Sequence, residues 1–121
     1  MSTKSKLLFL CYFDELIKTD CIIRFFDELQ DEIVCFIDKK GKIKVFSSVC
    51  PHFGGEIHYK KSENVLVCKW HNWKFCSDNG RCISYPVKIG LNPYDFTINP
   101  DNLKKYKVEK LKRKVFVKYE A

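Results

Sequence analysis

The chain has 121 residues, 45% of them hydrophobic and 15% aromatic, which is enough for one buried core of ordinary domain size but not for two. Charged residues make up 31% and no low-complexity tract is present, so a disordered or fibrous protein is excluded. The formal net charge is +7 and is uneven, because residues 1–38 hold eight acidic and four basic groups while the rest of the chain is basic. We therefore expect a single domain over residues 1–121.

Short β-branched and aromatic runs, separated by turn residues, predict a small antiparallel all-β domain. The first run, Leu7–Phe13, is far shorter than a membrane span and no small-residue cleavage site follows it, so we expect a strand rather than a membrane or secretory segment. A helical turn is predicted at 14–16, hairpin turns at 39–41 and 77–80, and a loop over 88–105. The other predicted strands are Ile22–Phe26, Ile33–Ile37, Ile43–Phe46, Val65–Val67, Trp73–Cys76, Arg81–Ser84 and Val115–Tyr119.

The segment Lys104–Lys114 is dense in positive charge, which by itself could indicate a nucleic-acid surface. However, Val115, Val117 and Tyr119 then alternate with other residues in the pattern of a terminal strand, and no helix-turn-helix or RNA-binding motif accompanies the charge. We therefore interpret these lysines as the solvated side of a strand, with no nucleic-acid or membrane partner. The sign of the charge favours an acidic protein partner.

The seven cysteines are odd in number and do not have the spacing of a small secreted disulfide framework. This usage is typical of a reducing compartment, so we expect a cytoplasmic protein. Cys11, Cys21 and Cys35 lie in apolar runs and are predicted to be core residues. Cys76 and Cys82 flank a turn and would lie opposite each other around a three-residue bulged loop, where we expect thiols rather than a disulfide.

Two short motifs combine a thiol with an imidazole, Cys50-Pro51-His52 and Cys68-Lys69-Trp70-His71, with fifteen residues between His52 and Cys68. Two such loops facing each other would present two thiolates and two imidazoles to one metal centre. Gly54-Gly55, next to the first motif, would let the backbone approach that centre closely. A Cys₂His₂ zinc site remains an alternative, although zinc motifs usually pair Cys with Cys and His with His. The third histidine, His58, is expected to be a solvated loop residue.

From Cys50 through Gly55, from Cys68 through Phe75 and at 79–81, the chain resembles the Rieske iron–sulfur family, in its soluble ferredoxin and ring-hydroxylating-oxygenase branch. The resemblance implies a small antiparallel Rieske-like β-sandwich, with two cluster-binding loops at about 48–58 and 66–76 projecting from one end. It also implies a [2Fe-2S] cluster whose inner iron is held by Cys50 and Cys68 and whose outer iron is held by His52 and His71.

The chain differs from the respiratory branch of that family at four positions. Gly55 and Trp70 stand where that branch has a disulfide between the loops, so no such disulfide can form. Trp73 and Phe75 stand where it has hydroxyl groups that donate hydrogen bonds to the cluster sulfurs. Fewer such bonds stabilise less negative charge, so we predict a reduction potential toward the bottom of the roughly −150 to +300 mV Rieske range.

The resemblance implies a one-electron carrier that accepts electrons from a flavoprotein or iron–sulfur reductase and donates them to a terminal oxygenase or other acceptor with an acidic docking face. We do not expect an enzyme, because the mononuclear iron of an oxygenase needs two histidines and a carboxylate, and only His58 remains after the cluster ligands. A small Rieske subunit of a multi-subunit reductase, such as a nitrite reductase, is the first alternative. A zinc-bound structural module is the second.

Overall fold

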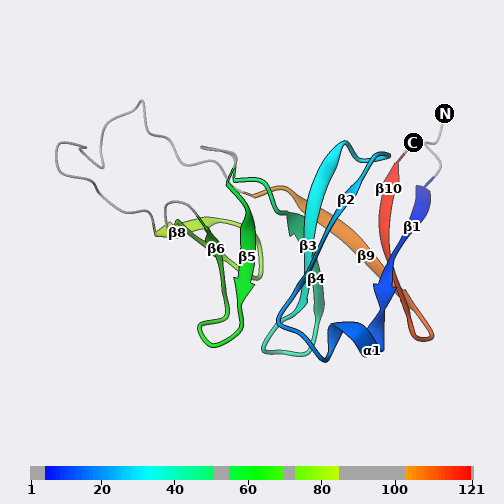
Figure 1. The fold of residues 1–121 in the computed structure, drawn as a ribbon, viewed down its shortest axis with the longest axis horizontal. Helices are drawn as coiled ribbons and strands as arrows, with labels where there is room; N and C mark the ends of the chain where they lie inside the picture. Colours follow the sequence, from blue (N-terminus) through cyan, green and yellow to red (C-terminus); the bar gives the residue numbers. More distant parts are fainter. Residues whose placement is uncertain (1–4, 51–54, 70–72, 85–102, 121) are drawn as a thin grey trace.

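A computed structural model describes residues 5–50, 55–69, 73–84 and 103–120. These residues form two antiparallel sheets, a larger one of six strands and a smaller one of four, with a single short helix (Figure 1). The predicted all-β class is therefore confirmed. No helix within the described ranges is long and apolar enough to cross a membrane.

The larger sheet has the strand order β1-β10-β9-β4-β3-β2. A helical turn, α1 (Phe13–Leu16), follows β1, close to the predicted position. The two edge strands, β1 and β2, are linked by Arg24, whose Nη1 donates to the carbonyl oxygen of Leu10 at 2.6 Å. The strands are β1 (Ser5–Tyr12), β2 (Ile22–Phe26), β3 (Asp31–Ile37), β4 (Ile43–Ser47), β9 (Lys105–Leu111) and β10 (Lys114–Glu120).

The smaller sheet runs β5-β6-β7-β8 and packs one face against the larger sheet. Ring stacking joins the two sheets, because Phe36 of β3 lies parallel to Tyr59 of β5 with ring centroids 4.0 Å apart. The core between the sheets is distinct from a second core on the other face of the larger sheet, which contains Cys11 and Cys35. The strands are β5 (Ile57–Lys60), β6 (Val65–Cys68), β7 (Lys74–Cys76) and β8 (Cys82–Ser84).

Two strands are absent from the sequence prediction. β5 was missed because only two apolar residues, Ile57 and Tyr59, alternate with polar ones. β9 begins at Lys105, at the end of the predicted loop, and its outward positions are mostly lysine, which lowers its apolar signal. Of that predicted loop, residues 88–102 lie outside the described residues.

The cysteines next to the β7–β8 turn do not face each other as predicted. Cys82 pairs with Phe75, so Cys76 is displaced by one position, and successive side chains of a strand point to opposite faces. Gly80 does have the positive φ expected of this turn, at 76°. All seven cysteines belong to the described part of the chain, and none of them is in a disulfide. Cys11 and Cys35 are buried as predicted.

Candidate metal centre

The first predicted metal-binding loop is closed at its base by backbone hydrogen bonding. The chain leaves β4 and reaches Cys50, whose N–H donates to the carbonyl oxygen of Gly55 at 2.8 Å. One residue further out on each side, Val49 and Glu56 form an isolated antiparallel bridge. The two ends of the loop, Cys50 and Gly55, are therefore held next to each other, and Cys50 is its first residue. His52 lies outside the described residues.

The second predicted loop is closed in the same way. Cys68 is the last residue of β6, and its N–H donates to the carbonyl oxygen of Trp73 at 2.8 Å, just before β7 begins. The second motif, like the first, thus presents its cysteine at the point where the chain leaves a regular ladder. His71 lies outside the described residues.

The bases of the two loops are joined to each other. Ile57 pairs with Cys68 in the β5–β6 ladder, and the N–H of Lys69 donates to the carbonyl oxygen of Glu56 at 2.9 Å. The N–H of Ile57 also donates to the carbonyl oxygen of Ser48 at 2.6 Å, which ties this ladder to the segment before Cys50. Two loops that are far apart in sequence therefore leave the fold from one continuous hydrogen-bonded base.

Both cysteines are buried in the core between the sheets. Cys50 is 1% exposed and Cys68 is fully buried, and both belong to the same cluster as Trp73 and Phe75. Trp73 and Phe75 thus pack in the same core as the two cysteines. The described ranges, which leave out two of the four predicted ligands, contain no group of three or more His, Cys, Asp or Glu side chains arranged to hold a metal ion.

Two neighbouring carboxylates at the start of β3 hold the strand that leads to Cys50. Ser48, which is fully buried, donates from Oγ to Glu32 Oε1 at 2.8 Å. Asp31 accepts from Ser47 Oγ at 3.0 Å and from the hydroxyl of Tyr106 at 2.6 Å. Burial, together with the bond to Asp31, raises the pKa of Tyr106. The sequence analysis did not predict these hydrogen bonds. Their one trace in the sequence is an acidic pair at the start of one strand and a serine pair at the end of the next.

His58 is on a strand, which corrects the expectation of a loop residue. It lies in β5 opposite Val67 and is only partly exposed. Because side chains alternate along a strand, His58 points to the face opposite that of Ile57 and its partner Cys68. It is therefore directed away from the core that holds both cysteines.

The Rieske [2Fe-2S] domain family matches residues 7–95, well over half of the chain. The chain belongs to this family. The resemblance carried by the two cysteine–histidine motifs is thus confirmed, and the domain implies a [2Fe-2S] cluster. The thiol groups fit such a cluster, since Cys50 and Cys68 present soft sulfur ligands from adjoining loop bases in an apolar surrounding.

Curated relatives are oxygenases and desaturases. The chain is 26% identical over 95 residues to cholesterol 7-desaturase of Drosophila melanogaster, covering 77% of this chain and 21% of the relative. It is 30% identical over 90 residues to the oxygenase subunit of 3-chlorobenzoate-3,4-dioxygenase of Comamonas testosteroni, covering 74% of this chain and 20% of that subunit. The chain thus spans about a fifth of the length of these relatives.

Solved structures of similar size share the fold. The cyanobacterial plasma membrane Rieske protein of Synechocystis PCC 6803 has a TM-score of 0.70 at 15% identity, covering 91% of this chain and 97% of that one. The ferredoxin of carbazole 1,9a-dioxygenase from Nocardioides aromaticivorans IC177 has a TM-score of 0.68 at 14% identity, covering 92% and 95%. The Rieske-like β-sandwich is therefore established. The family match supports a general role in electron transfer.

Proposed function

We propose that this chain is a one-electron carrier between a flavoprotein or iron–sulfur reductase and a terminal oxygenase or similar acceptor. In this proposal residues 1–121 are one Rieske domain, and the cluster ligands are Cys50, His52, Cys68 and His71, from loops at about 48–58 and 66–76. When bound, the [2Fe-2S] cluster accepts and releases a single electron. The chain is not itself a catalyst in this role.

The observation that carries the proposal is the shared base of the two loops. The hydrogen bonds of Cys50 and Cys68 to the far ends of their own loops, and the pairing of Ile57 with Cys68, bring two buried thiols from distant motifs to one end of the fold. The apolar core around the thiols excludes water from the sulfur ligands. Each loop carries a histidine beyond its cysteine, so imidazole and thiolate ligands arise from the same two loops.

The odd number and the spacing of the seven cysteines favour a reducing compartment, and we place the carrier in the cytoplasm. Within this chain, the histidine supply supports a carrier rather than an oxygenase. A mononuclear iron site would need two histidines beyond the cluster ligands, and His58 is the one histidine left in the sequence.

Reductive titration tests the proposal. The protein, purified without oxygen, is titrated with NADH in the presence of the reductase component of an aromatic-ring dioxygenase, and the visible absorbance is recorded. We expect uptake of one electron per chain by the wild type and by Cys76→Ser, a matched substitution at a strand cysteine outside the proposed ligand set. Cys68→Ser is expected to contain no acid-labile sulfide and to take up no electron. Electron uptake by Cys68→Ser, or none by the wild type, would overturn the proposal.

The kind of relative favours a second candidate, an electron-delivering component held permanently by an oxygenase, because the relatives are an oxygenase subunit and a desaturase. Purification of the tagged chain from its own source at physiological salt separates the two. A partner recovered at a constant 1:1 ratio supports the bound component, while a lone chain with fast, salt-sensitive electron exchange supports the carrier.

A further inference from the structure

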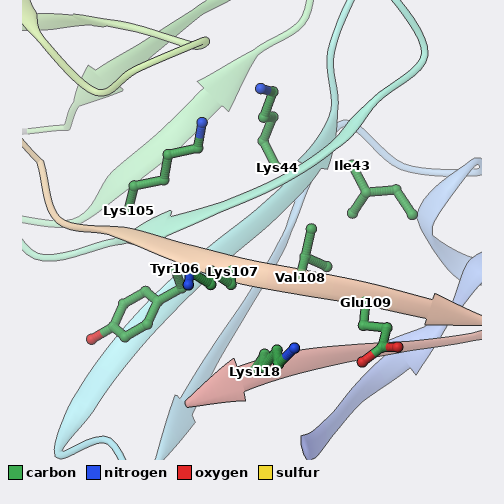
Figure 2. Close-up of a pocket in the computed structure, with 8 residues that line it drawn as sticks. All are labelled: Ile43, Lys44, Lys105, Tyr106, Lys107, Val108, Glu109 and Lys118. Carbon is green, nitrogen blue, oxygen red and sulfur yellow. The ribbon is translucent and has the colours of Figure 1, made fainter. Parts of the chain in front are cut away.

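Lysines from three strands line one groove on the larger sheet. The groove has a volume of about 570 Å³ and lies along β4, β9 and β10 (Figure 2). Strand register places its lysines on the same face: Lys105 pairs with Phe46, Lys107 is two positions further along β9, and Lys118 pairs with Lys107. Lys44, two positions before Phe46 on β4, completes the set.

This face continues the face that is covered by the smaller sheet. Phe36 and Phe46 are fully buried beneath that sheet, whereas Lys105, Lys107 and Lys118 are exposed beyond its margin. Lys105, at one end of the groove, follows a residue that is bonded to the segment before Cys50. The N–H of Ser47 donates to the carbonyl oxygen of Lys104 at 2.8 Å, and Cys50 follows three residues later.

The positive charge of the groove is only partly compensated by the protein itself. Lys107 and Lys118 are direct cross-strand partners, an arrangement in which like charges destabilise the ladder. Partial desolvation of its ammonium group, followed by the neighbouring charge of Lys44, lowers the pKa of Lys105. Asp78 accepts from Lys44 at 3.1 Å and, through its backbone carbonyl, from Lys105 at 2.9 Å. Among the described residues that line the groove, Glu109 is the one carboxylate, against four lysines.

We propose that Lys44, Lys105, Lys107 and Lys118 form the docking face for a carboxylate-rich surface of the redox partner protein. The inference deepens the proposed carrier function and rests on it. An acidic protein surface fits better than nucleic acid, because the sequence contains no nucleic-acid-binding motif beside its basic residues. Partner carboxylates would relieve the Lys107–Lys118 repulsion, and the attraction would bring the partner to the side of the molecule next to the Cys50 loop.

Charge reversal at Lys107 tests the docking face without endangering the fold. Lys107→Glu converts a like-charge pair into an opposite-charge pair with Lys118, so its thermal midpoint should not fall below that of the wild type. Lys18→Glu is the matched control, because Lys18 is exposed after α1, outside the groove, and the change in net charge is identical. The holoprotein is mixed with reduced flavodoxin, an acidic flavoprotein, at low ionic strength, and cluster reduction is followed by stopped flow.

We expect Lys107→Glu to slow reduction by about tenfold and to flatten its dependence on salt, while Lys18→Glu slows it less than about twofold. Equal effects of the two variants would mean that net charge alone matters and would overturn the docking face. Tighter binding of the wild type to duplex DNA than to flavodoxin, lost in Lys107→Glu, would overturn it in favour of a nucleic-acid surface. A wild type that dithionite cannot reduce would instead refute the carrier function itself.

Discussion

At the scale of single residues, the carboxylate of Glu32 is the support nearest to the first loop. Ser48 is fully buried, and its hydroxyl donates to Glu32 while its carbonyl oxygen accepts from Ile57. A hydrogen bond to a charged group contributes about 1.5–3 kcal/mol, and its loss leaves a partly buried carboxylate without this donor. Ser48 thus holds the backbone two residues before Cys50 through one bond to β3 and one bond to β5.

We predict that Ser48→Ala lowers the free energy of unfolding by about 1–3 kcal/mol and speeds the loss of iron to a chelator. Ser77→Ala is the control, since Ser77 is also buried but donates to the neutral side chain of Asn64 at 3.2 Å. Urea unfolding and chelator-trapped iron release are measured on both variants. Iron release from Ser48→Ala no faster than from Ser77→Ala would show that Ser48 does not support the metal centre.

Phe75 offers a second test at this scale. It is fully buried, pairs with Leu66, and so lies on the same sheet face as Cys68. Phe75→Tyr adds a hydroxyl on that face, and a hydrogen bond that favours the reduced cluster by about 1 kcal/mol would raise the midpoint potential by roughly 40 mV. Protein-film voltammetry measures the shift. An unchanged potential with an intact cluster would contradict the attribution of the low potential to missing hydroxyl donors.

At the scale of elements, the β7–β8 turn contacts both β4 and the segment before β9 at Gly80. A side chain at this position would place its Cβ 2.8 Å from the carbonyl oxygen of Leu103 and 2.8 Å from the ring of Phe46. Gly41, in the β3–β4 turn, has nearly the same backbone, with φ of 81° against 76°, but nothing within 4 Å of such a Cβ. The pair therefore separates backbone strain from close packing.

We predict that Gly41→Ala costs about 1 kcal/mol from the left-handed backbone alone, and that Gly80→Ala costs about 1–3 kcal/mol more from overpacking. The unfolding free energies from urea titration give both values. Equal losses would show that the turn can move away from Leu103 and Phe46 without penalty.

The hydroxyl of Tyr106 joins β9 to β3, and its raised pKa predicts a pH dependence. An unfolded tyrosine ionises near pH 10, whereas Tyr106 in the folded protein keeps its proton to higher pH. As the pH rises above about 10, the unfolded state loses the proton first, so the stability contributed by this group declines. Below pH 10 that contribution is present in full.

Tyr106→Phe should therefore lower the unfolding free energy by about 1–3 kcal/mol at pH 7, and the difference from the wild type should shrink by pH 11. Urea unfolding of the two proteins at both pH values provides the measurement. A difference that is constant or grows with pH would contradict the assigned sign.

At the scale of the whole molecule, the sequence predicted the features that depend on local pattern. The cysteine–histidine motifs predicted the family, and apolar alternation located eight of the strands. The register of β7 against β8 could not be predicted, because it depends on the length of the turn. A difference of one residue in the turn decides whether Cys82 pairs with Cys76 or, as observed, with Phe75. The lysine groove was equally inaccessible, since it combines Lys44 with lysines of β9 and β10 that become neighbours only through strand pairing.

In a chain of 121 residues, the proposed metal centre lies at one end of the sandwich core. The core between the sheets contains both cysteines, so the packing that stabilises the sandwich also fixes the loop bases. The carboxylates of Asp31 and Glu32 then connect the larger sheet to the first loop. Stability and metal binding are therefore coupled in this fold.

We propose that Cys50, His52, Cys68 and His71 together hold a [2Fe-2S] cluster. The most direct measurement is electron–nuclear double resonance on the dithionite-reduced protein. The protein is produced in cells supplied with nitrogen-15 histidine and is purified without oxygen. We predict couplings from two histidine nitrogens, with one of them lost in His52→Cys and the other in His71→Cys. Couplings from no nitrogen, or a set unchanged by both substitutions, would contradict the proposed ligands.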